Sequence, residues 1–174
     1  MPDGITITFE KKEAERLINK LLKRVKNPRK LVKTWKKYVA AVTFQMFKGR
    51  RPDTSPRRGV KWPKLAKSTL KQKAALRKRG KAIEIQRPLV RTGDMRDSLK
   101  VLKETNKGFV YGTRIKSRKG FSYAGVHNVG GKMGRPPMRK WLFLSDHDWR
   151  QIVKMAIDYL NGNLKAHRSY VSKK

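Results

Sequence analysis

Three segments of the chain carry apolar residues at the three- and four-residue spacing of an amphipathic helix. The first covers residues 11–26. The second begins at Asn27-Pro28, because asparagine suits an N-cap and proline suits the first helical position, and it runs to about Phe47. The third follows a cap at Ser145-Asp146 and ends at Asn161. The apolar positions are Ala14, Leu17, Ile18, Leu21, Leu22 and Val25 in the first helix, and Trp149, Ile152, Val153, Ala156, Ile157 and Leu160 in the last.

The middle of the chain has shorter elements. A further helix is expected after Ser68 as its N-cap, and Thr92-Gly93-Asp94 predicts a single helical turn. Alternating or β-rich runs predict short strands at residues 5–9, around Val101, and at residues 109–111, 121–126 and 141–144. The pattern therefore predicts an α+β fold, with N-terminal helices and a C-terminal helix packed on a small, mostly antiparallel sheet.

A chain of 174 residues suits one domain. We expect a single domain over residues 1–164, with an N-terminal helical hairpin at 11–48, a loop at 49–61, a core at 60–160 and a basic tail at 165–174. The chain has no cysteine, so it has no disulfide and no thiolate metal site. No apolar run approaches the roughly 18 residues of a membrane helix and the N-terminus lacks a signal-peptide pattern, so we expect a soluble cytoplasmic product with no membrane partner.

Charge is unusual in amount and in distribution. The 46 Lys and Arg exceed the 12 Asp and Glu, for a net charge of +34, and residues 16–83 hold 24 basic residues and one acid. Such a surface attracts polyanions, although a basic helix face can also be simply solvated. Without a base-reading motif, contact with DNA would involve the phosphate backbone and would depend steeply on salt. The candidate residues are Lys23, Arg24, Lys26, Arg29, Lys30, Lys33, Lys36 and Lys37.

Catalytic residues are hard to assemble from this sequence. His127-Asn128 is part of a nuclease-like pattern, and His147 lies between two aspartates, but neither histidine has further ligands at metal-binding spacing. No serine lies in a nucleophile elbow, and no glycine-rich phosphate loop is present. We therefore expect no enzyme, no metal and no cofactor. A nuclease that uses His127 remains the alternative to test.

Four short motifs follow one another in a fixed order. They are Trp62-Pro-Lys-Leu65 with Ser68-Thr69-Leu70, then residues 89–99 around Thr92-Gly93, then Tyr123-Ala124 with His127 and Gly130, and finally Arg135-Pro136-Pro137-Met138-Arg139 with Trp141. In this order they resemble the phage virion morphogenesis (tail completion) family, small proteins of the head–tail neck of tailed phages. The resemblance covers roughly residues 60–160.

The resemblance implies a structural virion protein that is assembled in the host cytoplasm, completes the tail end and supports head–tail joining. It implies a ring of identical subunits, six by tail symmetry, around the DNA path. The other partners would be the tail tube or tail terminator and the head connector. The subunit-contact candidates are Tyr123, His127, Arg135, Arg139 and Trp141. The alternative is a free-standing, non-specific nucleic-acid-binding protein.

Overall fold

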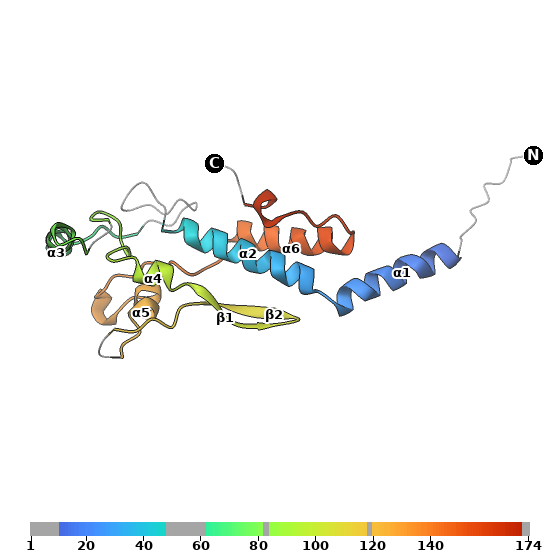
Figure 1. Cartoon of the computed structure of the whole chain (residues 1–174), viewed down its shortest axis with the longest axis horizontal. Helices are drawn as coiled ribbons and strands as arrows, with labels where there is room; N and C mark the ends of the chain where they lie inside the picture. The colour runs from blue at the N-terminus through green and yellow to red at the C-terminus, as the bar shows by residue number, and fades with distance from the viewer. Residues whose placement is uncertain (1–10, 48–61, 82–83, 118–119, 172–174) are drawn as a thin grey trace, which may run out of the picture.

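The computed structural model describes residues 11–47, 62–81, 84–117 and 120–171 (Figure 1). Within these ranges the chain has six α-helices, two short 3-10 helices and one two-stranded antiparallel sheet, so the expected α+β class is confirmed. The strand expected at 5–9 and the loop expected at 49–61 lie outside the described residues.

The elements follow one another from α1 to α6. Their bounds are α1 Lys11–Lys26, α2 Arg29–Gln45, α3 Lys67–Lys78, α4 Asp94–Asp97, β1 Lys100–Thr105, β2 Gly108–Gly112, α5 Tyr123–Val129, η1 Lys132–Gly134, α6 Asp146–Leu160 and η2 His167–Ser169. β1 pairs with β2 from Lys100 opposite Gly112 to Thr105 opposite Gly108, with an irregularity between Val101 and Lys103. No helix of the described segments is long and apolar enough to cross a bilayer.

α2 and α6 lie side by side and run in opposite directions (Figure 1). The indole Nε1 of Trp35 donates to the carbonyl oxygen of Ile152 at 3.1 Å, and one helical turn on, the hydroxyl of Tyr38 donates to buried Asp148 at 2.8 Å. This pairing explains why the apolar stripe of α2 is buried as expected. The buried residues of this cluster are Leu31, Tyr38, Val42, Met155 and Tyr170.

A second core forms where the end of α2 meets the motif segments. Phe47 contacts the rings of Trp62 and Trp141, with ring centroids 6.4 and 6.1 Å apart. The indole of Trp62 donates to the carbonyl oxygen of Lys140 at 3.0 Å, and that of Trp141 to the carbonyl oxygen of Ala124 at 2.9 Å. Both tryptophans are thus anchors that bury a large ring and satisfy its polar end. The buried members of this core are Met46, Phe47, Trp62, Val90, Met95, Ala124 and Trp141.

α1 and α2 do not form the expected hairpin. α1 extends past the end of the α2–α6 pair instead of folding back along it (Figure 1). Contacts with the end of α6 fix this arrangement: the Arg24 guanidinium donates to the carbonyl oxygen of Leu160, and the Tyr159 hydroxyl contacts the carbonyl oxygens of Arg24 at 3.2 Å and Asn27 at 2.7 Å. Arg24 thereby caps one of the carbonyl groups that the end of α6 leaves unpaired, that of Leu160.

Two of the expected strands are wrong. Residues 123–129 are helical, and the Ser117 amide donates to the carbonyl oxygen of Phe121 at 2.8 Å. Residues 141–144 form no strand because the side chain of Asn128 takes the place of a partner strand. Its Oδ1 accepts hydrogen bonds from the amides of Trp141 and Leu142, each at 3.0 Å.

The helix caps were predicted with mixed success. Ser145 is the N-cap of α6 as expected, and it forms a capping box in which its Oγ accepts from the Asp148 amide while the Asp148 carboxylate accepts from the Ser145 amide. Ser68 is not a cap, because α3 begins at Lys67 with Ala66 as its N-cap. Pro28, and not Asn27, is the N-cap of α2.

Within the described part of the expected basic tail, Tyr170 and Val171 pack on the domain, whereas Lys165, Ala166, Arg168 and Ser169 are exposed. Tyr170 is 5% exposed and belongs to the α2–α6 core. Its hydroxyl donates to the Asp158 carboxylate at 2.6 Å and accepts from the Lys165 amide at 3.2 Å. The packed domain therefore continues at least to Val171, beyond the expected boundary at residue 164.

Candidate functional site

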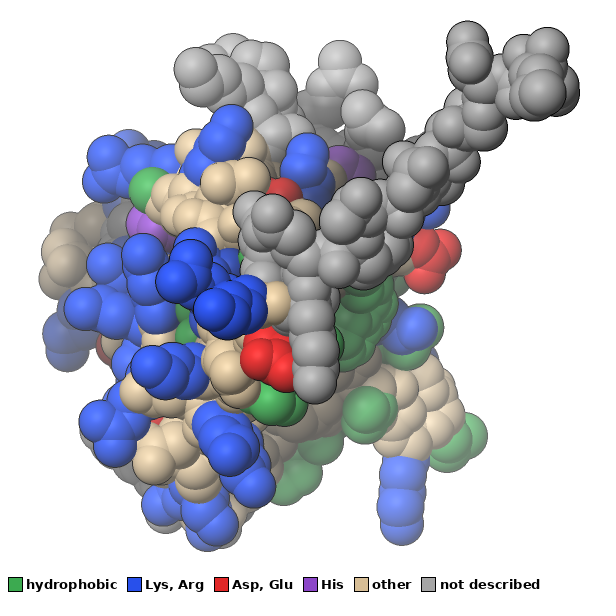
Figure 2. Space-filling view, turned by 90° about the vertical axis from the view of Figure 1, so that its right-hand side faces the viewer, with side chains coloured by type: hydrophobic (Ala, Val, Ile, Leu, Met, Phe, Trp, Pro, Cys, Tyr) green, Lys and Arg blue, Asp and Glu red, His purple; other side chains and the backbone are tan. Residues whose placement is uncertain are grey.

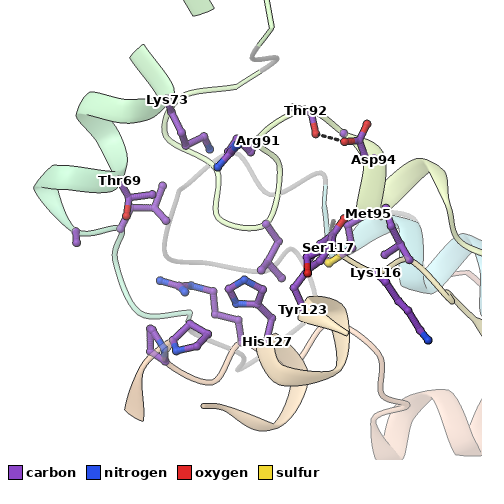
Figure 3. A pocket seen from close by; sticks show the side chains of 18 of the residues that line it. Thr69, Lys73, Arg91, Thr92, Asp94, Met95, Lys116, Ser117, Tyr123 and His127 are labelled. Atoms are coloured by element: carbon purple, nitrogen blue, oxygen red, sulfur yellow. Dashed lines mark hydrogen bonds between the residues drawn. The ribbon is translucent and has the colours of Figure 1, made fainter. Parts of the chain in front are cut away.

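Residues from all four motifs line a cavity of about 860 Å³ (Figure 3). α3 and the segment before it supply one wall, residues 89–95 a second, and α5 with residues 136–139 a third. Tyr123 and His127 both face it because they are four residues apart on α5. The four sequence motifs thus meet at one end of the molecule, although no strand brings them together.

The lining of the cavity is rich in cations. Five basic side chains and one carboxylate, that of Asp94, line it, and the Asp94 carboxylate accepts a hydrogen bond from the Thr92 hydroxyl at 2.5 Å (Figure 3). The basic residues are Lys64, Lys73, Arg91, Lys116 and Arg139. This balance favours a negatively charged group in the cavity over a metal ion. Among the described residues, no three His, Asp or Glu side chains are placed to hold a metal.

Lys73 is the most unusual of these cations, because its side chain is only 2% exposed. Its ammonium donates to the carbonyl oxygen of Arg87 at 2.6 Å. Burial lowers the pKa of Lys73 to about 8; nearby Arg91 lowers it further, and Glu84 opposes the change. An anion beside this ammonium would stabilise its charged form.

Arg139 and His127 form the opposite wall. The Arg139 guanidinium donates to the carbonyl oxygen of Pro63 at 2.9 and 3.2 Å and to that of Lys64 at 3.3 Å, so it ties the Trp62 segment to the last motif. Burial lowers the pKa of Arg139. Burial, reinforced by the Arg139 charge, also lowers the pKa of His127, whose buried Nδ1 has no hydrogen-bond partner in the described part of the chain.

These positions revise the subunit-contact candidates. Arg139 and Trp141 are 5% and 3% exposed and bonded within the chain, so burial removes both from that set. Tyr123 and His127 are half-buried and face the cavity. Burial raises the pKa of Tyr123, and nearby Asp94 adds to the effect. Only Arg135 is exposed on the surface.

The basic surface lies on the other part of the molecule, along α1 and α2. Figure 2 shows Lys and Arg side chains crowding one side of the end from which α1 projects. Arg24 and Lys36 are half-buried and already engaged, Arg24 with Leu160 and Lys36 with the Glu104 carboxylate at 2.7 Å. The other six candidates are exposed: Lys23, Lys26, Arg29, Lys30, Lys33 and Lys37. Of these, Arg29 also donates to the Asn106 side chain at 3.0 Å.

No protein-family model matches the chain, and no curated protein or solved structure matches it. The assignment of a function therefore depends on the residues and their geometry, together with the motif resemblance.

Sequence patterns did not indicate that the cations of the cavity meet, although Lys64, Arg91 and Arg139 lie in the sequence motifs. Lys73, Arg91 and Lys116 come from three separate segments, and a lysine that will be buried looks the same in a sequence as one that stays in water. The α5 helix, in contrast, did leave a signal. Tyr123 and His127, like Ala124 and Asn128, stand four residues apart, which is a helical spacing.

Proposed function

We propose that this chain is a non-enzymatic structural subunit of a tailed-phage particle, which completes the tail end and supports head–tail joining at the neck. The phage assignment rests on the ordered motifs at Trp62, Thr92-Gly93, Tyr123-Ala124 and Arg135-Pro136. Their convergence at one end of the fold, around a shared core and cavity, is consistent with one unit of structure and not with scattered coincidences.

The observation that carries an assembly role is the incomplete burial of apolar side chains. A chain with a net charge of +34 still exposes large hydrophobic residues along α1 and α6, at 42–62% of their surface. Apolar rows of this kind on a soluble protein mark contact surfaces. In the proposed ring they meet neighbouring subunits, and the tail tube or terminator and the head connector bind the two ring faces.

The basic surface fits a ring that surrounds DNA. Six exposed cations along α1 and α2 can face the phosphate backbone without reading bases. The proposed ring is sixfold, in keeping with the symmetry that the family resemblance implies, and the virion is its proposed location.

The decisive experiment is mass spectrometry and electron microscopy of tailed particles purified from cells that produce this chain. We expect a few copies per particle, with density for the chain at the neck. Intact particles without the chain would contradict the proposal.

One observation favours the alternative, a free-standing nucleic-acid-binding protein. Lys30, Lys33 and Lys37 stand three and four residues apart on α2 and are all exposed, so they form one continuous basic row. Tight duplex binding by the isolated chain, lost when these three lysines are changed to glutamate, together with absence from particles, would favour that function.

A further inference from the structure

α1 carries a row of apolar side chains that nothing in the described chain covers. Five of them, from Leu17 to Val25, are 42–62% exposed, although they follow the one-face spacing of a buried helix. Single exposed apolar residues are ordinary, but five on one face of a projecting helix form a contact surface. The row is Leu17, Ile18, Leu21, Leu22 and Val25.

α6 carries a second row. Met155 and Asp148 face α2 and are fully buried, whereas Trp149, Val153 and Ile157 are 52–55% exposed. The apolar arc of α6 is therefore wider than the surface that α2 covers. The three exposed residues are four apart, so they form one ridge along the helix.

The two rows match in length, and α6 is the least basic of the long helices. Each spans eight residue steps, from 17 to 25 and from 149 to 157, or about 12 Å at 1.5 Å per residue. α1 has seven basic and two acidic residues, a net charge of +5. Apart from the buried Asp148, α6 has two basic and two acidic residues and no net charge. α2 and α3 carry five basic and no acidic residues each, so α6 is the one described helix of twelve or more residues that would not repel α1.

The α1 row cannot reach the α6 row of its own chain in this arrangement. The contacts of Arg24 with Leu160, and of Tyr159 with Arg24 and Asn27, hold α1 pointing away from α6. The Arg24 guanidinium lies close to Gly162, 2.6 Å from the position that a Cβ would take there. Folding α1 back would break all of these contacts.

We propose that α1 of one copy packs its apolar row on the Trp149–Val153–Ile157 ridge of the next copy. The contact joins two different surfaces, so it propagates head to tail and closes into a ring when the rotation between copies allows. This pairing names the contact between subunits in the proposed ring. That the copies close into a ring rests on the proposed function.

A cross-linking experiment tests the pairing, and the absence of cysteine makes the chain a clean background. Leu21 and Val153 are the central residues of the two rows. When the single variants Leu21→Cys and Val153→Cys are mixed at 0.5 M NaCl and mildly oxidised, we expect a covalent dimer joined through positions 21 and 153. The double variant should give a ladder of covalent oligomers. A disulfide confined to one chain, or no 21–153 product, would overturn the pairing, and a dimer without higher oligomers would overturn its head-to-tail order.

Val110→Cys is a matched control, because Val110 is 52% exposed but lies on β2, outside both rows. Mixed with Leu21→Cys, it should give little cross-linked product, and equal yield would overturn the pairing. Sedimentation gives a second readout: Leu21→Asp or Val153→Asp should yield monomers, while Val110→Asp should associate like the unmodified chain. The cross-linking experiment uses purified protein alone and is independent of the test on particles. If no cross-link formed although the chain was found at the neck, the pairing would be contradicted and the proposed neck function would stand.

Discussion

At the residue scale, Lys73 shows how the fold confines a cation. Its folded pKa of about 8 lies below the ordinary value of 10.5, so between these two pH values the unfolded chain binds the proton more strongly. Stability must therefore rise with pH across this window, and below pH 8 the full penalty of the buried charge remains. The shift corresponds to up to about 3 kcal/mol at roughly 1.4 kcal/mol per pKa unit.

Lys73→Met should remove this pH dependence. Between pH 8 and pH 10.5, we expect the free energy of unfolding of the unmodified chain to rise by up to about 3 kcal/mol more than that of the variant. Denaturant titrations of both proteins at several pH values measure the difference between their free energies of unfolding. Because the other lysines are the same in both proteins, their titration cancels in this difference. A constant difference across the window would show that Lys73 is not buried as a charge.

Asn128 is a second residue whose single side chain organises a segment. Its Oδ1 accepts from two backbone amides, those of Trp141 and Leu142. Asn128→Ala leaves both amides without this acceptor and should lower the free energy of unfolding by about 2 kcal/mol, while Asn128→Asp keeps an oxygen there and should lose much less. Thermal or denaturant unfolding compares the two variants, and equal losses would rule out the acceptor role.

At the element scale, helix caps allow the sequence and the structure to be compared directly. Ser145 caps α6 through a reciprocal pair with Asp148, whereas Ser68 lies inside α3 and makes no cap hydrogen bond. Ser145→Ala should therefore lower the free energy of unfolding by about 1 kcal/mol, and Ser68→Ala should leave it unchanged within about 0.5 kcal/mol. Chemical denaturation measures both, and a larger loss at Ser68 than at Ser145 would reverse the assignment.

The pattern of the sequence predicted the long helices well because helical periodicity is a local property. The bounds of α1 are those expected, and the buried stripe of α2 was found correctly. The strands expected at residues 121–126 and 141–144 do not form. Apolar and aromatic residues of these segments pack in the second core instead, where the side chains of Asn128 and Trp141 form hydrogen bonds with the backbone. Periodicity also identified the apolar faces of α1 and α6 without showing what covers them.

The candidate site depended still more on tertiary structure. Of its polar residues, His127 and Arg139 belong to sequence motifs, but Lys73 has no local mark of burial. The cavity exists because α3, residues 89–95 and α5 converge, and only the three-dimensional arrangement defines that convergence (Figure 3). A sequence can indicate which residues matter without indicating which of them meet.

At the scale of the whole molecule, the net charge of +34 opposes self-association and favours DNA binding. Added salt should therefore strengthen the proposed α1–α6 association between copies and weaken the proposed binding of DNA. The Debye length falls from roughly 10 Å at 0.1 M to 3 Å at 1 M, so added salt weakens the repulsion between copies while the apolar α1–α6 contact persists. Binding to duplex DNA should weaken, with a log–log slope near −5 if all six exposed cations contact phosphates.

Sedimentation and DNA titration of the same sample between 0.05 and about 0.5 M NaCl measure both trends. Changing Lys30, Lys33 and Lys37 together to Gln should reduce the DNA slope by about 3, since each phosphate contact contributes close to one unit. The same change at Lys71, Arg77 and Lys78, exposed on α3, alters the net charge equally and should leave most of the slope in place. Equal effects of the two triple variants would mean that DNA binding depends on total charge and not on the basic row of α2. Association that weakens as salt is added would mean that charge pairs, and not the apolar rows, hold the copies together.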